Sequence, residues 1–195
     1  MNILDKIQIA IAKPDQIATL VKSGQTGSAI GYYAILLIFM VVMSTIVSVV
    51  LGLALSSVMG PFGIFGSTTG QAIFEIALMP LTYGLALVGF FIAAAILHVL
   101  LLIFGARGGI EKTIQSYAYS STPTLLFGWV PILGWAIWVW FLVLMIITSA
   151  KVHDISMLRS VLALFVVPAI ILAIIVTGIF ILAFLVFGAM GGIGI

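Results

Sequence analysis

Few side chains in this 195-residue chain could take part in acid–base or metal chemistry, and the two histidines, His98 and His153, are among them. A histidine beside a carboxylate can bind a metal ion or transfer a proton, and Glu111 and Asp154 lie near these histidines in the sequence. Loop residues, however, are usually solvated, and a neutral imidazole near a helix end can hydrogen-bond to a neighbouring helix. We therefore favour a structural role for both histidines over a ligand site.

A second polar group lies further along the chain, where Gln115, Tyr119 and Thr122 are spaced i, i+4, i+7. This spacing places the three side chains on one face of a helix. Lipid offers no hydrogen bonds, so such a face must turn into the protein. It predicts hydrogen bonds between helices, which we favour, or a polar path or ligand pocket. Together with His98 and His153, these residues form the candidate polar inner face.

Catalytic motifs are missing from the sequence. It contains no HExxH zinc motif, no GxSxG nucleophile elbow and no pair of membrane-embedded aspartates. The chain has no cysteine, which excludes disulfides, thiol redox chemistry and thiolate metal sites. We therefore expect no enzymatic activity, no catalytic residue, no cofactor and no metal ion.

The composition indicates an integral membrane protein whose partner is the lipid bilayer. Hydrophobic residues make up 64% of the chain and charged residues only 6%, with a mean hydropathy of +1.43. Soluble domains carry about a quarter charged residues. The net charge of +2 is too small, and the basic residues are too scattered, to indicate nucleic-acid binding. Four uncharged stretches each exceed the roughly 20 apolar residues that cross a bilayer as a helix: 23–74, 76–106, 113–150 and 160–195.

The elements that must position these residues form an all-α membrane bundle. We predict five crossings at about 28–58, 72–104, 113–127, 134–150 and 160–188. A glycine-rich loop at 60–70 joins the first two. The stretch 113–150 is roughly twice one crossing, and Gly128, Pro131 and Gly134 at its centre predict a tight hairpin. Because its first arm is short and polar, that arm is either a full crossing or a partly re-entrant one.

Residues 1–27 are expected to form a cytoplasmic amphipathic segment ahead of the membrane domain at 28–195. Ile3, Leu4, Ile7, Ala10 and Ile11 share one helical face, with Asp5, Lys6, Gln8 and Lys13 largely off it. Pro14 ends this helix, because proline lacks the N–H that the helix needs. Such helices lie in the membrane interface with their lysines toward anionic headgroups; docking to a partner protein is the alternative.

The positions of the basic residues predict the orientation. They lie in the N-terminal segment, after the second span and after the fourth: Lys6, Lys13, Lys22, Arg107, Lys112, Lys151 and Arg159. With five crossings they all fall on one side, as the positive-inside rule requires, whereas four crossings would separate the two basic loops. We predict a multi-pass protein of the cell membrane with its N-terminus in the cytoplasm and its C-terminus outside.

Small residues recur at every fourth position along the first predicted span. They are Ser44, Ser48, Gly52 and Ser56. This spacing puts them on one ridge, where small side chains let another helix approach closely. We expect tight packing within the bundle, and an interface with a protein partner or a second copy of the chain is the alternative.

Residues 117–168 carry a pattern that resembles the Yip1-domain family, in particular its prokaryotic members. The matching features are a Ser-Thr-Pro sequence, a proline–glycine hairpin, a tryptophan-bearing helix, a Lys-Val-His-x-Ile-Ser loop and a proline in the last helix: 121–123, Pro131, Gly134, Trp135, Trp138, Trp140, 151–156 and Pro168. The Pro14 segment and the five-crossing layout also fit, so the likeness covers nearly the whole chain. It implies a five-helix membrane domain with a cytoplasmic N-terminus.

The resemblance also carries expectations about function. Eukaryotic members are linked to vesicle traffic and to Rab-type GTPases, generally as scaffolds without enzymatic activity. That role relies on a long cytoplasmic N-terminal region, and the short segment 1–27 argues against a GTPase partner here. We expect a membrane scaffold or organiser that acts through protein partners or self-association, in membrane organisation or trafficking-like processes. The alternative is a small-solute or ion transporter or channel using the polar third helix, because discontinuous helices often build transport sites.

Overall fold

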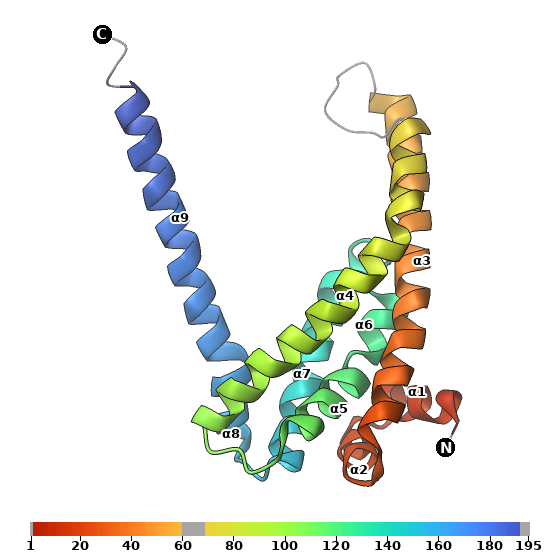
Figure 1. The fold of residues 1–195 in the computed structure, drawn as a ribbon, viewed down its shortest axis with the longest axis vertical. Helices are drawn as coiled ribbons and strands as arrows, with labels where there is room; N and C mark the ends of the chain where they lie inside the picture. Colours follow the sequence, from red (N-terminus) through yellow and green to blue (C-terminus); the bar gives the residue numbers. More distant parts are fainter. Residues whose placement is uncertain (1, 60–68, 192–195) are drawn as a thin grey trace.

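The computed structural model describes residues 2–59 and 69–191, and these residues are almost entirely helical (Figure 1). The predicted loop at 60–70 lies mostly outside them. In chain order the elements are α1 (Ile3–Ala12), the 3₁₀ turn η1 (Pro14–Gln16), α2 (Ile17–Ser23), α3 (Thr26–Met59), α4 (Thr69–Ile103), α5 (Ile110–Ser120), α6 (Thr122–Phe127), α7 (Leu133–Val152), α8 (Met157–Val161), the π-helical turn η3 (Leu162–Val166) and α9 (Val167–Gly191). The all-α prediction is confirmed for the described part of the chain.

Four of the described helical segments are long and apolar enough to cross a membrane. They are Thr26–Ser57, Thr69–Ile103, Leu133–Val152 and Met157–Leu182. The predicted count of five is not confirmed, because the third predicted crossing consists of the two short helices α5 and α6. Figure 1 shows that α6 ends part-way along α3, where the chain turns back into α7.

The break between α5 and α6 has a local cause. Pro123 has no N–H to donate to the carbonyl four residues earlier, which belongs to Tyr119. The Thr122 hydroxyl donates to that carbonyl instead, at 2.7 Å. Ser121 ends α5 and donates its own hydroxyl to the Tyr117 carbonyl at 2.7 Å. The chain therefore keeps its backbone carbonyls bonded while it changes direction inside the bundle.

The hairpin between α6 and α7 forms where the sequence predicts it. The Leu133 N–H donates to the Pro131 carbonyl at 2.8 Å, which closes a three-residue turn around Ile132. Ile132 has φ 71° and ψ −50°, an uncommon conformation for a β-branched residue. A Cβ on Gly134 would lie 2.9 Å from the Gly128 carbonyl oxygen, so only glycine lets these two segments approach so closely.

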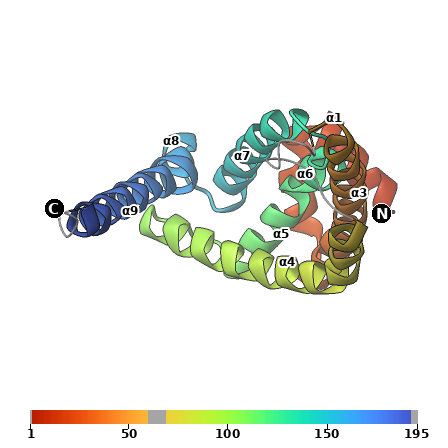
Figure 2. The same cartoon turned by 90° about the horizontal axis from the view of Figure 1, so that it is seen from above.

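The helices diverge from a common base. In Figure 1 the first part of α4 lies beside α3, and α4 then crosses the molecule to the base of α9, which rises at the other side without packing along α3. Figure 2 shows α5, α6 and α7 near α3 and α4; α8 packs against α7, and α9 extends away from the bundle. The base of α9 follows η3, where the Val167 N–H bonds to the Leu162 carbonyl, five residues earlier. Pro168 comes next and cannot donate to Leu164, which accounts for the wider turn.

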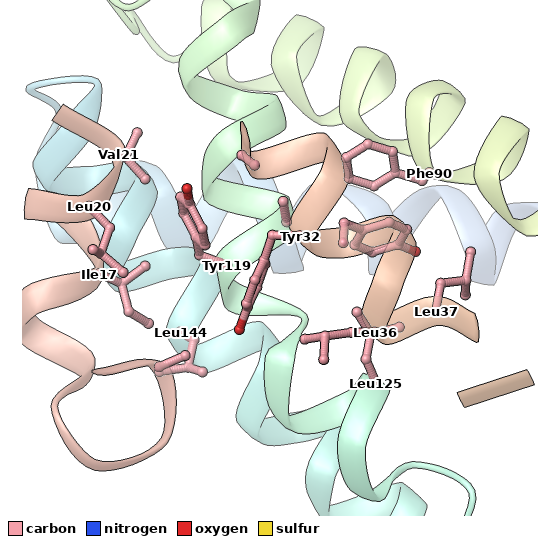
Figure 3. Close-up of a cluster of buried hydrophobic side chains, with 14 of the residues drawn as sticks. Ile17, Leu20, Val21, Tyr32, Leu36, Leu37, Phe90, Tyr119, Leu125 and Leu144 are labelled. Carbon is pink, nitrogen blue, oxygen red and sulfur yellow. The ribbon is translucent and has the colours of Figure 1, made fainter. Parts of the chain in front are cut away.

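The N-terminal helices share the core of the bundle. Ile17, Leu20 and Val21 of α2 are buried, and α2 packs against α5 and α7 (Figure 3). Helix α1 turns Lys6 inward, with only 9% of the residue exposed, and leaves Leu4 70% exposed. The sequence predicts that Lys6 points away from the protein toward lipid headgroups, whereas in the structure aromatic rings from distant parts of the chain cover it.

The basic segments lie at one end of the molecule. In Figure 1 the loops at 104–109 and 153–156 are at the end that carries α1 and α2. The Arg107 N–H donates to the His153 carbonyl at 3.2 Å, which joins the two loops. Lys151 forms an ion pair with Asp15 at 2.7 Å, which joins the end of α7 to η1. The pair is exposed and contributes little stability.

Candidate functional site

Helix α5 is polar in sequence and buried in the structure. It packs against α2, α3, α4 and α7, and Thr113, Gln115, Ser116 and Ser120 on it are each at most 5% exposed. A buried polar side chain must find hydrogen-bond partners or lose free energy. The neighbours of α5 therefore determine what its side chains can do.

One side of α5 meets both histidines through Thr113. The Thr113 hydroxyl oxygen lies 2.8 Å from Nδ1 of His98 on α4 and 3.0 Å from Nε2 of His153 after α7. A hydroxyl has one proton to donate, so it donates to one ring nitrogen and accepts from the other. This chain of hydrogen bonds ties together α4, α5 and the end of α7.

His153 is fully buried among these elements. Burial lowers the pKa of His153 to about 4, with the nearby positive charges of His98 and Lys112 adding to the effect. Its Nδ1 has no hydrogen-bond partner among the described residues. Gly108 packs against this nitrogen so closely that a Cβ there would come within 2.5 Å of it. The imidazole is thus neutral at physiological pH and fixed between two loops.

The opposite side of α5 carries Gln115 and Tyr119, which face the start of α3 together with Thr122, the first residue of α6. Gln115 Nε2 donates to the Thr26 hydroxyl at 2.9 Å. The Thr122 hydroxyl lies 2.8 Å from the Tyr32 hydroxyl as well as bonding the Tyr119 carbonyl. The Gln115 side-chain oxygen is buried without a partner among the described residues.

The five candidate residues therefore do not form one face. Thr113 is about 200° around the helix from Gln115, so the histidines lie on the other side of α5 from Gln115, Tyr119 and Thr122. Sequence reasoning missed Thr113, whose role depends on partners 15 and 40 residues away. It also missed Lys6, for which the only local signal is its i, i+4 spacing to the buried Ala10.

Lys6 completes the second group. Its Nζ lies 5.6 Å from the ring centres of both Tyr32 and Tyr119 and donates to the Ser28 hydroxyl at 2.8 Å. The two tyrosine rings are 5.4 Å apart. A cavity of about 220 Å³ opens beside this group. Its lining residues are Lys6, Leu20, Ser23, Gly24, Ser28 and Tyr119.

Other cavities lie along the helices. The predicted ridge on α3 contributes Ser44 and Ser48 to a cavity of about 260 Å³ between α3 and α4, together with Glu75 and Thr82 of α4. The Ser44 hydroxyl donates to the Met40 carbonyl of its own helix at 2.7 Å. A cavity of about 470 Å³ at the hairpin is lined mainly by tryptophan, proline and glycine and by no ionisable side chain.

The described part of the chain offers few side chains that could bind a metal ion. Among residues 2–59 and 69–191, no three histidine or carboxylate side chains lie close enough together to hold a metal ion. The two histidines share a threonine hydroxyl, and their ring centres are 6.0 Å apart. Their hydrogen bonds to the Thr113 hydroxyl can hold α4, α5 and the end of α7 together.

Comparison with known proteins gives one match. A family model described as the Yip1 domain matches residues 28–189. No curated protein and no solved structure matches the chain.

Proposed function

Because the chain belongs to the Yip1 domain family, we propose that it is a non-enzymatic membrane scaffold that acts through protein partners or self-association. It organises membranes or takes part in trafficking-like processes. The family match and the four long apolar helices make it a multi-pass membrane protein.

The observation that carries the scaffold proposal is the isolation of α9. This apolar helix packs mainly against η3 at its own base, and side chains along it are exposed, with Ile174 at 66% and Phe180 at 72%. Helices in membranes associate through van der Waals packing of matched surfaces. A helix that its own chain leaves uncovered is available to a helix of a partner or of a second copy.

The hydrogen bonds of α5 and of Thr122 in α6 support this role over transport. Gln115 and Thr122 bond to Thr26 and Tyr32 across helices, and Thr113 bonds to both histidines. A transport path needs polar groups that are free to meet a solute. The features that favour transport are the break after Ser120 and the buried hydroxyls of Ser116 and Ser120, which have no partner among the described residues.

We further propose a topology in which the N-terminus is cytoplasmic and the C-terminus is outside. Helices α5 and α6 enter from the cytoplasmic side, and α7 returns to it, so all basic loops stay on one side. The absence of cysteine from the chain allows single cysteines to report on each loop. Gly109→Cys, at a position with open space around it, should react from the cytoplasmic face; reaction from outside would overturn this topology.

The same lack of cysteine allows a sharp test of the scaffold proposal. Ile174→Cys and Ile181→Cys place thiols seven residues apart on exposed positions of α9, and Ala163→Cys places one at a fully buried position as the control. In native membranes we expect a crosslinked dimer or a reproducible adduct from the α9 positions and none from the control. A strictly monomeric protein without reproducible adducts would overturn the proposal.

A further inference from the structure

We propose that the cavity beside Lys6 binds the phosphate of an anionic lipid headgroup. The site lies between α1, α2, the start of α3 and α5, at the end of the molecule where the basic loops gather. This inference does not rest on the scaffold role.

The first reason is that Lys6 is buried with its charge uncompensated. The residue is 9% exposed, and an ammonium group has three N–H donors, of which Ser28 accepts one. Within residues 2–59 and 69–191 the only ion pair joins Lys151 to Asp15. The neighbouring Asp5 accepts the Asn2 N–H and caps α1. The rings of Tyr32 and Tyr119 stabilise the cation only in part.

The second reason is the hydroxyl of Tyr119, which forms no hydrogen bond with residues 2–59 or 69–191. Tyr119 is 1% exposed and lines the cavity. Its side-chain oxygen would lie 3.6 Å from a Cβ on Gly24, another lining residue. Figure 3 shows the Tyr119 hydroxyl pointing toward the part of α2 that carries Leu20 and Val21, and the Tyr32 hydroxyl pointing the other way. The Tyr119 O–H is therefore placed to donate into the cavity.

The third reason is the arrangement of donors around the space. Lys6 and the hydroxyls of Ser28 and Tyr119 line a cavity of about 220 Å³ that no carboxylate lines. Ser23 also lines it, but its hydroxyl donates to the Thr19 carbonyl. Ser28 lies in the first turn of the long helix α3, whose N-terminus favours negative charge. Phosphate oxygens accept charge-assisted hydrogen bonds from lysine and ordinary ones from hydroxyls. The donor set therefore fits a phosphate.

The exposed side of α1 indicates a lipid as the source of the phosphate. Ile3, Leu4 and Ile11 are 39%, 70% and 40% exposed on a helix that also carries Lys6. Apolar residues of this kind on a short helix enter the boundary between headgroups and acyl chains. A headgroup in the cavity would then have its acyl chains beside α1, whereas inorganic phosphate would use only the donors.

The test uses the full chain purified in a neutral detergent and heated with increasing concentrations of short-chain phosphatidylglycerol. We expect the lipid to raise the unfolding temperature and phosphatidylcholine or inorganic phosphate to raise it much less. Lys6→Gln should raise the half-saturating lipid concentration by at least about tenfold, because it removes a charge-assisted hydrogen bond. Lys22→Gln, which removes the same charge from an exposed position, should behave like the unaltered protein.

Ser28→Ala keeps the lysine and gives an independent result if Lys6→Gln does not fold. It should weaken the phosphatidylglycerol effect severalfold, since it removes the hydroxyl that holds Nζ in place. Equal lipid responses in the unaltered protein and in the folded variants would overturn the site. An equal response to phosphatidylcholine would overturn the anionic headgroup, and an equal response to inorganic phosphate would overturn the lipid source.

Discussion

Thr113→Val removes the hydroxyl that joins the two histidines and changes little else, because valine has almost the shape of threonine. The two hydrogen bonds are 2.8 Å and 3.0 Å long, and Thr113 and His153 are both 0% exposed. The change leaves Nδ1 of His98 and Nε2 of His153 without this partner. An unpaired buried polar group costs about 1–3 kcal/mol, and His98 is only half-buried and costs less, so we expect the free energy of unfolding to fall by about 2–3 kcal/mol.

The assay is denaturant unfolding in detergent micelles, followed by tryptophan fluorescence, with Thr113→Ser as the matched control. Serine keeps the hydroxyl and loses only a methyl group, so Thr113→Ser should cost about 1 kcal/mol. A double-mutant cycle with His153→Phe should show a coupling of at least about 1 kcal/mol between the two positions. If Thr113→Val costs no more than Thr113→Ser, or if the coupling is absent, the hydrogen-bond chain does not stabilise the fold as described.

Three further predictions concern the loops around this group and the hairpin. Burial lowers the pKa of His153 from 6.5 to about 4, so the unfolded chain binds more protons in that interval. Stability should therefore be complete above about pH 6.5 and fall by up to about 3 kcal/mol as the pH drops to 4; the loss should be smaller in His153→Gln, and an equal loss would contradict the assignment. Gly108→Ala should lower the unfolding free energy by about 1–3 kcal/mol, because its Cβ would meet the fixed His153 ring at 2.5 Å, whereas Gly109→Ala, with open space around it, should be neutral in the same unfolding assay. Ile132→Gly should raise the unfolding temperature, with a gain of about 1 kcal/mol, because it relieves a positive φ at a side chain that is 87% exposed; a lower unfolding temperature would show that this turn is not strained.

Local chemistry in the sequence predicts the hairpin and the helical class. Pro131 and the flanking glycines at 128 and 134 have conformational requirements that act within a few residues, and the turn forms between them. The break after Ser120 is also visible, since Pro123 removes a donor from the helix. The count of crossings is harder, because hydropathy does not distinguish a helix that spans from two short helices that turn back.

The candidate site depends on contacts that no local pattern contains. Gln115, Tyr119 and Thr122 share a face as their spacing predicts, but the histidines reach α5 through Thr113 on the other side. Lys6 looks like a surface lysine on an amphipathic helix. It is buried because Tyr32 and Tyr119, far away in the sequence, supply two ring faces for it. Such a pairing follows from packing between helices and not from periodicity.

Because α9 is attached to the bundle mainly at its base, a small rotation at the π-helical turn would move its far end a long way. Helix α9 has 25 residues, which corresponds to a length of about 37 Å at 1.5 Å per residue. Because η3 is its main attachment to the bundle, a rotation of about 10° there would move the far end by about 6 Å, from the same length. The π-helical turn at Leu162–Val166, about which such a rotation would occur, packs against α4 and α7. A small change in packing at those two helices would thus set how widely the two arms of the molecule stand apart in the bilayer.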